Sequence, residues 1–422
     1  MSKFDIDKVE TYLKSKYIFR FNSIKEKPEY VEITNLKGHY KPIDRFTINT
    51  IKRELLRSEK IPVSVNALYE IIESDFCKKV NPIREYFENL PMYDGKEDYI
   101  QILADTIKLV SEHPEEERKT FNYLFKKWMA SVVANVMDEY ICRNHTCFVL
   151  TGEQGTYKTT WLENLCPKDL RNMYLYSGKI NPNSKDVNSY IAETLFLNID
   201  DQLSQLNRKD ENDLKELITK NKVSYRRPYD KYISEYPHIC SFMASVNGND
   251  FLTDSTGNRR FLPFEVKSID INLAQKLMKD NESQIYAQAK EISKKGFLFE
   301  GKNVEYYITG EDIAEINKRN EKFEFISYEQ DVVSKYFIVP NAIYPENAFM
   351  STGEIMDYAV MFAKGDKINL YRIGKALSKL GYTKSQKKIN GNRISGWKVH
   401  KIDTTNEKKY EPNNYYETEK TY

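Results

Sequence analysis

Long hydrophobic runs are absent from this 422-residue sequence. The longest apolar stretches, such as MASVVANVM at 129–137, are far shorter than the roughly 20 residues that a membrane-spanning helix needs. The first residues, MSKFDIDKVE, lack the basic and then apolar segments of a secretion signal. We therefore expect a cytoplasmic protein that has no membrane partner.

Cysteine is also scarce, because the chain has only five, an odd number, and they are widely scattered. Only Cys142 and Cys147 are close in sequence, and His145 between them is isolated. This group does not supply the second pair of ligands that a zinc site requires. The pattern predicts free thiols in a reducing compartment.

An excess of either charge is missing as well, since 64 Lys and Arg residues stand against 62 Asp and Glu residues. A chain with a net charge of +2 is not attracted as a whole to a polyanion, so any basic residues that bind one must be gathered locally. Apolar residues make up 40% of the chain, enough for the cores of two or three globular domains.

One segment has the pattern of a phosphate-binding loop. Residues 147–165, CFVLTGEQGTYKTTWLENL, combine an apolar strand, a glycine-bearing turn, a lysine, a hydroxyl residue and a helix. In such loops the backbone N–H groups bind phosphate, the lysine reaches the β- and γ-phosphates, and the hydroxyl binds Mg²⁺. Lys158 and Thr159 occupy the last two positions. The predicted nucleotide contacts are Gly152, Glu153, Gln154, Gly155, Thr156, Tyr157, Lys158, Thr159 and Thr160.

Tyr157 stands where most such loops have a glycine. The phosphate cradle consists of backbone amides, so a side chain is tolerated there if it points away from the nucleotide. The substitution is costly only if the residue must adopt a positive φ. The alternative for the whole segment is a chance strand, turn and helix that happens to contain a lysine.

A second apolar strand ends in two carboxylates. TLFLNIDDQL at 194–203 places Asp200 and Asp201 at its end. We expect Asp200 to hold Mg²⁺ through water together with Thr159, and Asp201 to orient or deprotonate the attacking water. Paired acids are also common as helix caps, which is the alternative interpretation.

Two adjacent arginines precede a further apolar strand, in FLTDSTGNRRFLPFEV at 251–266. A guanidinium is costly to leave unpaired near a core, so Arg259 and Arg260 need a partner. Either could reach the nucleotide of a neighbouring subunit and neutralise charge in the transition state. The alternative is a surface pair that forms salt bridges within its own domain.

These segments together resemble the virulence-associated E family, ATPases of phages and mobile elements related to superfamily 3 helicases. The resemblance is carried by the order of the strands, by NPIREYFENLPMYDGKEDYI at 81–100 and FKKWMASVVANVMD at 125–138, and by SYRRPYDKY at 224–232 and GNRRF at 257–261. It implies ATP and Mg²⁺ as cofactors and a homo-oligomeric, hexamer-like ring. It also implies that Asn247, after the strand HICSFMASV, contacts the γ-phosphate rather than only forming a turn.

By this resemblance, the protein would act on single-stranded or forked DNA during replication of the element. A separate primase or initiator is a possible further partner. Superfamily 3 rings grip DNA with a hairpin that lies just before the strand corresponding to HICSFMASV. Here TKNKVSYRRPYDKYISEYPHI at 219–239 is basic and rich in tyrosine. The predicted DNA contacts in it are Lys222, Arg226, Arg227 and Lys231. The alternative is a solvated loop whose arginines pair with nearby acids.

The carboxyl-terminal region predicts two helices and a hairpin that turns at Asn390–Gly391, the pattern of a winged helix. Its basic residues include Arg372, Lys375, Lys387 and Lys388, which we expect to contact DNA phosphates. Winged helices also serve as protein-interaction modules, which is the alternative.

The fold predicted overall is α/β, with a P-loop AAA+-like ATPase core, a mixed or helical amino-terminal region and a carboxyl-terminal winged helix. The expected parts are an accessory domain (1–75), a helical collar (76–140), the ATPase domain (141–300), a helical linker (301–345), the winged helix (346–402) and a disordered tail (403–422). The leading functional hypothesis is an ATP-dependent DNA helicase or translocase. The alternatives are a nucleotide-switched replication initiator and a regulatory or phage-interference protein without unwinding activity.

Overall fold

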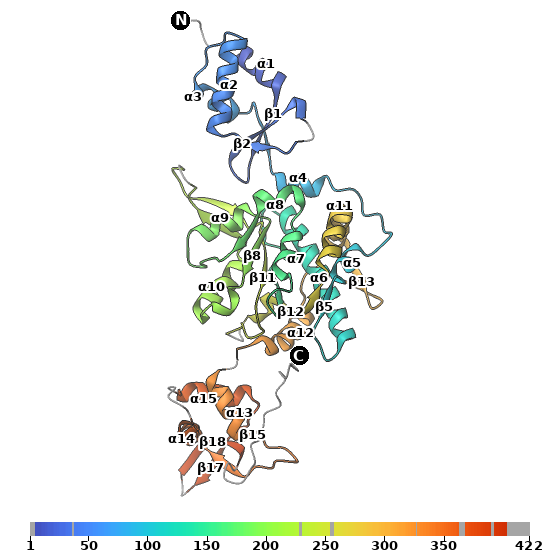
Figure 1. Ribbon diagram of the computed structural model, residues 1–422. Coiled ribbons are helices and arrows are strands. Elements are labelled where there is room, and N and C mark those ends of the chain that lie inside the picture. The colour runs from blue at the N-terminus through green and yellow to red at the C-terminus, as the bar shows by residue number, and fades with distance from the viewer. Residues whose placement is uncertain are drawn as a thin grey trace, which may run out of the picture. The chain divides into compact units, whose positions relative to one another are not determined.

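The computed structural model describes residues 5–35, 38–227, 230–253, 257–325, 327–362, 368–389 and 392–402. They form two compact units that divide after Glu324 (Figure 1). The predicted turn at Asn390–Gly391 and the predicted tail at 403–422 lie outside the described residues. In the described ranges, no helix combines the length and apolarity that a bilayer crossing demands.

A six-stranded sheet lies at the centre of the first unit, with the order β5-β12-β6-β11-β8-β7. All neighbouring pairs are parallel except β12 and β5. Strands β6 and β11 are buried along their whole length, because parallel strands are covered on both faces. The strands are β5 (Ile107–Leu109), β6 (Cys147–Thr151), β7 (Leu175–Gly178), β8 (Phe196–Asp200), β11 (Ser241–Ser245) and β12 (Phe261–Ile269).

Alternate residues of these strands enter two separate hydrophobic cores. Phe148 and Leu150 of β6 pack with the helices of one face, whereas Cys147 and Val149 pack with those of the other. The first face is covered by α4 (Pro82–Glu88), α5 (Tyr99–Ala104), α6 (Pro114–Met137), α7 (Lys158–Asn164), α8 (Lys168–Tyr174) and α11 (Ile271–Lys295). The second is covered by α9 (Asp186–Glu193), η2 (Leu203–Gln205) and α10 (Arg208–Thr219).

The amino-terminal part of the first unit has its own small core and a four-stranded sheet of order β3-β2-β1-β4. Asp5 caps the first helix, since its carboxylate accepts a hydrogen bond of 3.3 Å from the Lys8 backbone N–H. The elements are α1 (Ile6–Lys16), β1 (Tyr17–Asn22), β2 (Lys27–Glu32), η1 (Ile33–Asn35), β3 (Lys41–Pro42), α2 (Arg45–Ser58), α3 (Val65–Ile72) and β4 (Lys78–Val80).

The residues predicted to form a helical linker, 301–345, divide between the two units. Helix α12 packs on the first unit, because Arg319 forms two hydrogen bonds, of 2.6 and 2.9 Å, with the carboxylate of Glu117 on α6. The elements before the division are β13 (Phe297–Phe299), β14 (Lys302–Val304), α12 (Gly310–Asn320) and η4 (Glu321–Phe323).

The second unit begins with α13 (Tyr328–Tyr336) and contains two further helices and a sheet in which β18 pairs with β15, β16 and β17. Its core is built around Trp397, whose indole N–H donates a hydrogen bond of 2.9 Å to the Thr352 hydroxyl. The remaining elements are β15 (Phe337–Ile338), β16 (Ala348–Met350), α14 (Thr352–Phe362), α15 (Leu370–Lys379), β17 (Lys384–Ile389) and β18 (Asn392–Lys401).

Candidate nucleotide site

The loop between β6 and α7 turns sharply through residues of positive φ. These are Gly152 at 127°, Gly155 at 85° and Tyr157 at 63°. Gly152 is required for a second reason, because a Cβ atom there would lie only 2.6 Å from the backbone oxygen of Val266. The loop is thereby held close against β12, the next strand of the sheet.

Tyr157 adopts the left-handed conformation that the sequence analysis identified as the costly case. A non-glycine residue in this region costs about 1 kcal/mol. The side chain is 57% exposed, so the ring lies in solvent rather than inside the loop. The backbone oxygen of Tyr157 accepts a hydrogen bond of 2.9 Å from Trp161 in the first turn of α7. The tyrosine therefore leaves the interior of the loop to backbone groups.

Lys158 is buried and its ammonium lies within the loop. The Nζ atom donates hydrogen bonds to the backbone oxygens of Gly152 at 3.0 Å and Glu153 at 2.6 Å. It also donates to the Thr156 hydroxyl at 3.2 Å and to Asn247 Oδ1 at 3.4 Å. Burial lowers the pKa of Lys158, while Asp201 and Asp200 act in the opposite direction. The contact to Asn247 joins the loop to the end of the neighbouring strand.

The side chain of Thr159, at the start of α7, is in direct contact with that of Asp200, at the end of β8. The Thr159 hydroxyl donates a hydrogen bond of 2.8 Å to Asp200 Oδ1. The Ser245 hydroxyl donates to the same oxygen at 2.6 Å and lies 2.9 Å from the Thr159 hydroxyl. Three oxygen atoms thus converge, and Ser245 is a member that sequence reasoning missed.

Asp201 follows with a φ of 47°, so it is, like Tyr157, a non-glycine residue of this site in the left-handed region. Its backbone N–H donates to the Ser245 oxygen at 2.9 Å, and its carboxylate accepts a hydrogen bond of 3.2 Å from the Asn247 N–H. The carboxyl ends of parallel strands meet at one sheet edge, which explains why residues far apart in sequence come together here. The residues joined are Lys158, Thr159, Asp200, Asp201, Ser245 and Asn247.

The two candidate arginines lie elsewhere. They belong to a short 3₁₀ turn, η3 (Asn258–Arg260), that leads into β12. Arg259 is exposed, and the Nε atom of Arg260 is buried without a hydrogen-bond partner. Burial, followed by the charge of Arg259, lowers the pKa of Arg260. Within the described residues, no hydrogen bond or ion pair connects either arginine to the loop at 152–159.

The basic segment at 219–239 contains an antiparallel hairpin formed by β9 (Lys222–Tyr225) and β10 (Ser234–Pro237). Arg226 and Lys231 are exposed in the connection between the strands. Lys222 is 3.9 Å from the carboxylate of Glu235 on the opposite strand. Of the predicted hairpin contacts, these three residues are accessible to a ligand.

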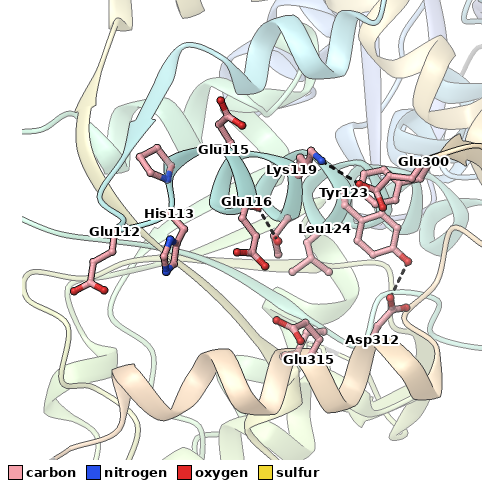
Figure 2. Close-up of a pocket in the computed structure, with 14 residues that line it drawn as sticks. Glu112, His113, Glu115, Glu116, Lys119, Tyr123, Leu124, Glu300, Asp312 and Glu315 are labelled. Carbon is pink, nitrogen blue, oxygen red and sulfur yellow. Dashed lines mark hydrogen bonds and ion pairs between the residues drawn. The ribbon is translucent and has the colours of Figure 1, made fainter.

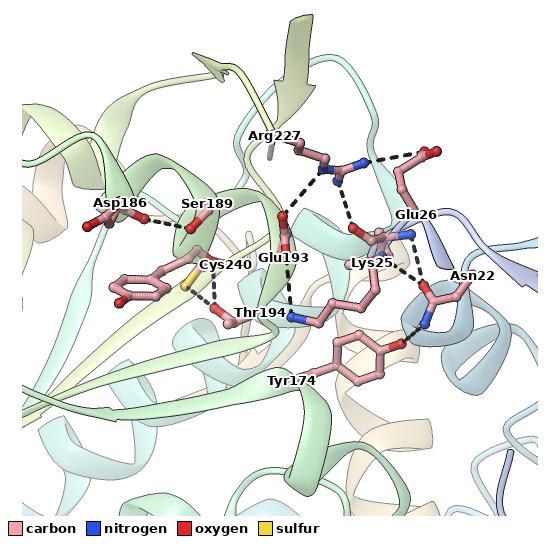
Figure 3. A network of polar contacts seen from close by, with 12 residues as sticks. Asn22, Lys25, Glu26, Tyr174, Asp186, Ser189, Glu193, Thr194, Arg227 and Cys240 are labelled. Carbon is pink, nitrogen blue, oxygen red and sulfur yellow. Dashed lines mark hydrogen bonds and ion pairs between the residues drawn. The ribbon is translucent and has the colours of Figure 1, made fainter. Parts of the chain in front are cut away.

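Arg227 requires a correction, because its side chain is only 9% exposed and is engaged inside the first unit (Figure 3). Its guanidinium donates a hydrogen bond of 2.7 Å to the backbone oxygen of Ile24, in the turn between β1 and β2. It also lies 3.4 Å from the carboxylates of both Glu26 and Glu193. Arg227 therefore joins the hairpin to the amino-terminal sheet and to α9, and it is not available to DNA in this structure.

Basic residues of the second unit lie on α15 and β17. The predicted contacts Lys375, Lys387 and Lys388 are exposed. Arg372 is exposed as well, with its guanidinium 3.9 Å from Glu329. The Nζ atom of Lys387 lies 5.7 Å from the centre of the Phe349 ring. A lysine in this arrangement covers the apolar ring while its ammonium stays at the surface.

The five cysteines are all buried as unbonded thiols. Burial raises the pKa of Cys142 to about 12 and of Cys240 to about 12. Such thiols are poor metal ligands and nucleophiles. Across the part of the chain that the structure describes, no group of three His, Cys, Asp or Glu residues is placed to hold a metal ion.

A cavity of about 700 Å³ lies away from the loop, between the start of α6, the β13–β14 turn and α12 (Figure 2). None of the predicted nucleotide residues lines it. Its one lysine, Lys119, is 3.2 Å from the carboxylate of Glu300. The acidic lining consists of Glu112, Glu115, Glu116, Glu300, Asp312 and Glu315. This charge is unsuited to a triphosphate, so the cavity is not the nucleotide site.

The described structure is a mixed α/β protein whose main sheet is largely parallel. A family model described as the virulence-associated protein E-like domain matches residues 87–324, which is more than half of the chain. The chain therefore belongs to the virulence-associated protein E-like family, as its motifs predicted.

Among solved structures, the apo structure of the NrS-1 C-terminal region is similar, with a TM-score of 0.50 at 13% identity. The match covers 93% of this chain and 98% of that one. Two structures of the A form of the same region give TM-scores of 0.48 at 14% identity. At such identities the likeness concerns the fold alone. No curated protein sequence matches the chain.

Proposed function

We propose that this chain is an ATPase that moves along or unwinds single-stranded or forked DNA during replication of a phage or mobile genetic element. The observation that carries the proposal is the convergence of Lys158, Thr159, Asp200 and Asn247 at one edge of a parallel sheet. The strand order β12-β6-β11-β8-β7 places the loop strand beside the strand that ends near Asn247. This arrangement supports a P-loop core of the AAA+ kind.

The residues of the loop fit a nucleoside triphosphate and Mg²⁺. No N-cap side chain accepts a hydrogen bond from the backbone N–H groups at the start of α7, and Lys158 supplies a positive charge in the same loop. Thr159 and Asp200 offer the hard oxygen ligands that Mg²⁺ prefers. The metal, when bound, would neutralise charge on the phosphates.

The remaining polar groups have distinct roles in the proposed hydrolysis. The carboxylate of Asp201 is fixed by the Asn247 backbone N–H, so it is positioned to accept a hydrogen bond from the attacking water. The Asn247 side chain already contacts Lys158 and would act beside the γ-phosphate. Arg259 and Arg260 have no contact with their own loop in the described residues, which supports their action on a neighbouring subunit in a ring.

Two surfaces support DNA as the substrate of the motor. The first is the hairpin connection with Arg226 and Lys231, together with Lys222 on β9. The second is the carboxyl-terminal unit. Its element order of one helix, two strands, two helices and the antiparallel pair β17–β18 supports a winged helix, and exposed lysines lie on β17.

DNA-stimulated ATP hydrolysis by the whole chain tests this proposal. We expect Lys158→Ala to abolish turnover and Asp201→Asn to retain ATP binding while losing hydrolysis. Subunits carrying Arg259→Ala and Arg260→Ala, mixed with Lys158→Ala subunits, should recover part of the activity if an arginine acts across an interface. ATP binding without turnover would favour a nucleotide-switched initiator, and absence of DNA binding would favour a regulatory protein.

A further inference from the structure

Helix α2 of the amino-terminal domain has a solvent face that no part of the proposed motor uses. Ile48, Ile51 and Leu55 are fully buried and attach the helix to the domain core. The residues on the opposite side share exposure and a lack of negative charge. They are Arg45, Phe46, Asn49, Arg53, Leu56 and Arg57. At 3.6 residues per turn they form one continuous stripe, about 18 Å long.

The positive charge of this face has no counter-ion among the residues that the structure describes. In the described residues, no ion pair or hydrogen bond involves the side chains of Arg45, Arg53 or Arg57. The three arginines are therefore available to an external anion.

The carboxylates nearest in sequence are engaged elsewhere or lie at the helix ends. Asp44 caps α2 by accepting a hydrogen bond of 2.7 Å from the Thr47 N–H. Glu54 is turned inward and accepts hydrogen bonds from the hydroxyls of Tyr12 at 2.8 Å and Tyr17 at 3.3 Å. Glu59 follows the last helical residue.

An aromatic ring lies among the arginines. Phe46 is 79% exposed, the highest value for any phenylalanine in the described ranges. A shallow depression at its side is lined by Arg45, Phe46, Asn49, Thr50 and Arg53. Exposure of an apolar ring to water is unfavourable. The ring can instead stack on an unpaired base while the neighbouring arginines contact phosphates.

We propose that the outer face of α2 is a binding site for single-stranded nucleic acid, in which Phe46 stacks on a base and Arg45, Arg53 and Arg57 contact the phosphates. The site is separate from the hairpin and from the carboxyl-terminal unit, and it does not depend on ATP hydrolysis. Duplex is less suitable, because a stacked base pair offers no free face to the phenylalanine ring.

Fluorescence anisotropy of the whole chain with a labelled oligo-dT, and with a duplex of equal length, tests the site. Combining Arg45→Ala, Arg53→Ala and Arg57→Ala should lower the slope of log Kd against log salt by about 2, because each single-strand phosphate contact contributes about 0.7. Phe46→Ala should weaken oligo-dT binding at least about 5-fold and duplex binding little, whereas Phe46→Tyr should retain affinity. The matched control combines Lys8→Ala, Lys14→Ala and Lys16→Ala on α1 and should leave the slope near that of the unmodified chain.

Photocrosslinking gives an independent measurement that does not rely on loss of function. A benzophenone amino acid at position 46 should form an adduct with the labelled oligo-dT, and a parallel oligo-rU distinguishes RNA from DNA. An unchanged salt slope in the arginine variant would overturn the proposal. Two other results would also overturn it. The first is that the arginine variant loses oligo-dT and duplex binding equally while Phe46→Ala affects neither. The second is that the benzophenone forms an adduct only between protein subunits. ATP hydrolysis that depends on Lys158 is measured in the same variants. If the variants retain it while nucleic-acid binding is unchanged, the negative result concerns α2 alone.

Discussion

The Ser245 hydroxyl lies 2.6 Å from Asp200 Oδ1 and is almost fully buried, with 3% of the residue exposed. The same hydroxyl is 2.9 Å from Thr159, so one serine touches both proposed Mg²⁺ ligands. Groups in this position orient metal ligands, and their loss typically costs 10- to 100-fold in metal affinity or activity.

We predict that Ser245→Ala raises the Mg²⁺ concentration needed for half-maximal ATPase activity by about 10-fold. The matched control is Ser241→Ala at the other end of the same strand, where the hydroxyl accepts a hydrogen bond from Asn144 at 3.1 Å. An equal effect of the two substitutions on the Mg²⁺ titration would show that Ser245 acts only through the stability of β11.

A second prediction concerns the left-handed backbone of Tyr157. Tyr157→Gly should raise the free energy of unfolding by up to about 1 kcal/mol, since glycine accepts the φ of 63° without steric cost. Tyr157→Val should lower it, because a β-branched residue suits this region least. Urea unfolding measures both. The Kd for nucleotide should change little in Tyr157→Gly, and a large loss of affinity would contradict the outward position of the ring.

The adjacent residues Arg226 and Arg227 should behave in opposite ways. Arg227→Ala should lower the free energy of unfolding by about 2 kcal/mol, because it removes the buried hydrogen bond to the Ile24 oxygen and the ion pairs with Glu26 and Glu193. Arg226→Ala should leave stability within about 0.5 kcal/mol and lower the salt slope of single-strand binding by about 0.7. Denaturant unfolding and salt-dependent anisotropy of both variants separate the two roles. Comparable stability of the two variants would refute the buried role of Arg227.

Acid should destabilise the first unit through His238. This imidazole is buried, its Nδ1 lies 2.6 Å from the Lys220 backbone oxygen, and burial lowers its pKa to about 4. An unfolded histidine has a pKa of about 6.5, so between these values the unfolded state binds more protons. The stability is therefore complete above pH 6.5 and is lost as the pH falls towards 4, by about 3 kcal/mol in total.

Urea unfolding between pH 7 and pH 4 checks this expectation. His238→Asn, whose amide can still donate to the Lys220 oxygen, should be less stable at pH 7 but should lose less stability on acidification. Parallel pH profiles of the variant and the unmodified chain would mean that other groups control the acid response.

The sequence was most informative where strand ends converge. An apolar strand followed by glycines, lysine and threonine predicts a loop, and the order of Asp200 and Asn247 predicts that both reach it. The structure brings these residues into contact, although their chemistry remains a prediction. Ser245 escaped notice because serine within a strand has many structural roles, and only the hydrogen bond to Asp200 distinguishes it.

Sequence reasoning failed for Arg227 because its partners are distant in the chain. The accepting oxygen belongs to Ile24, 203 positions away, in a turn whose place could not be derived from local patterns. Two adjacent arginines in a basic segment look equivalent in sequence. Burial distinguishes them, and burial depends on the folded amino-terminal domain.

The link from Arg227 to the β1–β2 turn also limits how the hairpin can move. The guanidinium contacts the Ile24 oxygen, Glu26 and Glu193 at once. A displacement of the hairpin base must either carry the amino-terminal sheet along as one body or break these contacts together. If the hairpin moves during the proposed ATP hydrolysis, that movement would therefore also displace, or detach from, a sheet that contributes no residue to the nucleotide site.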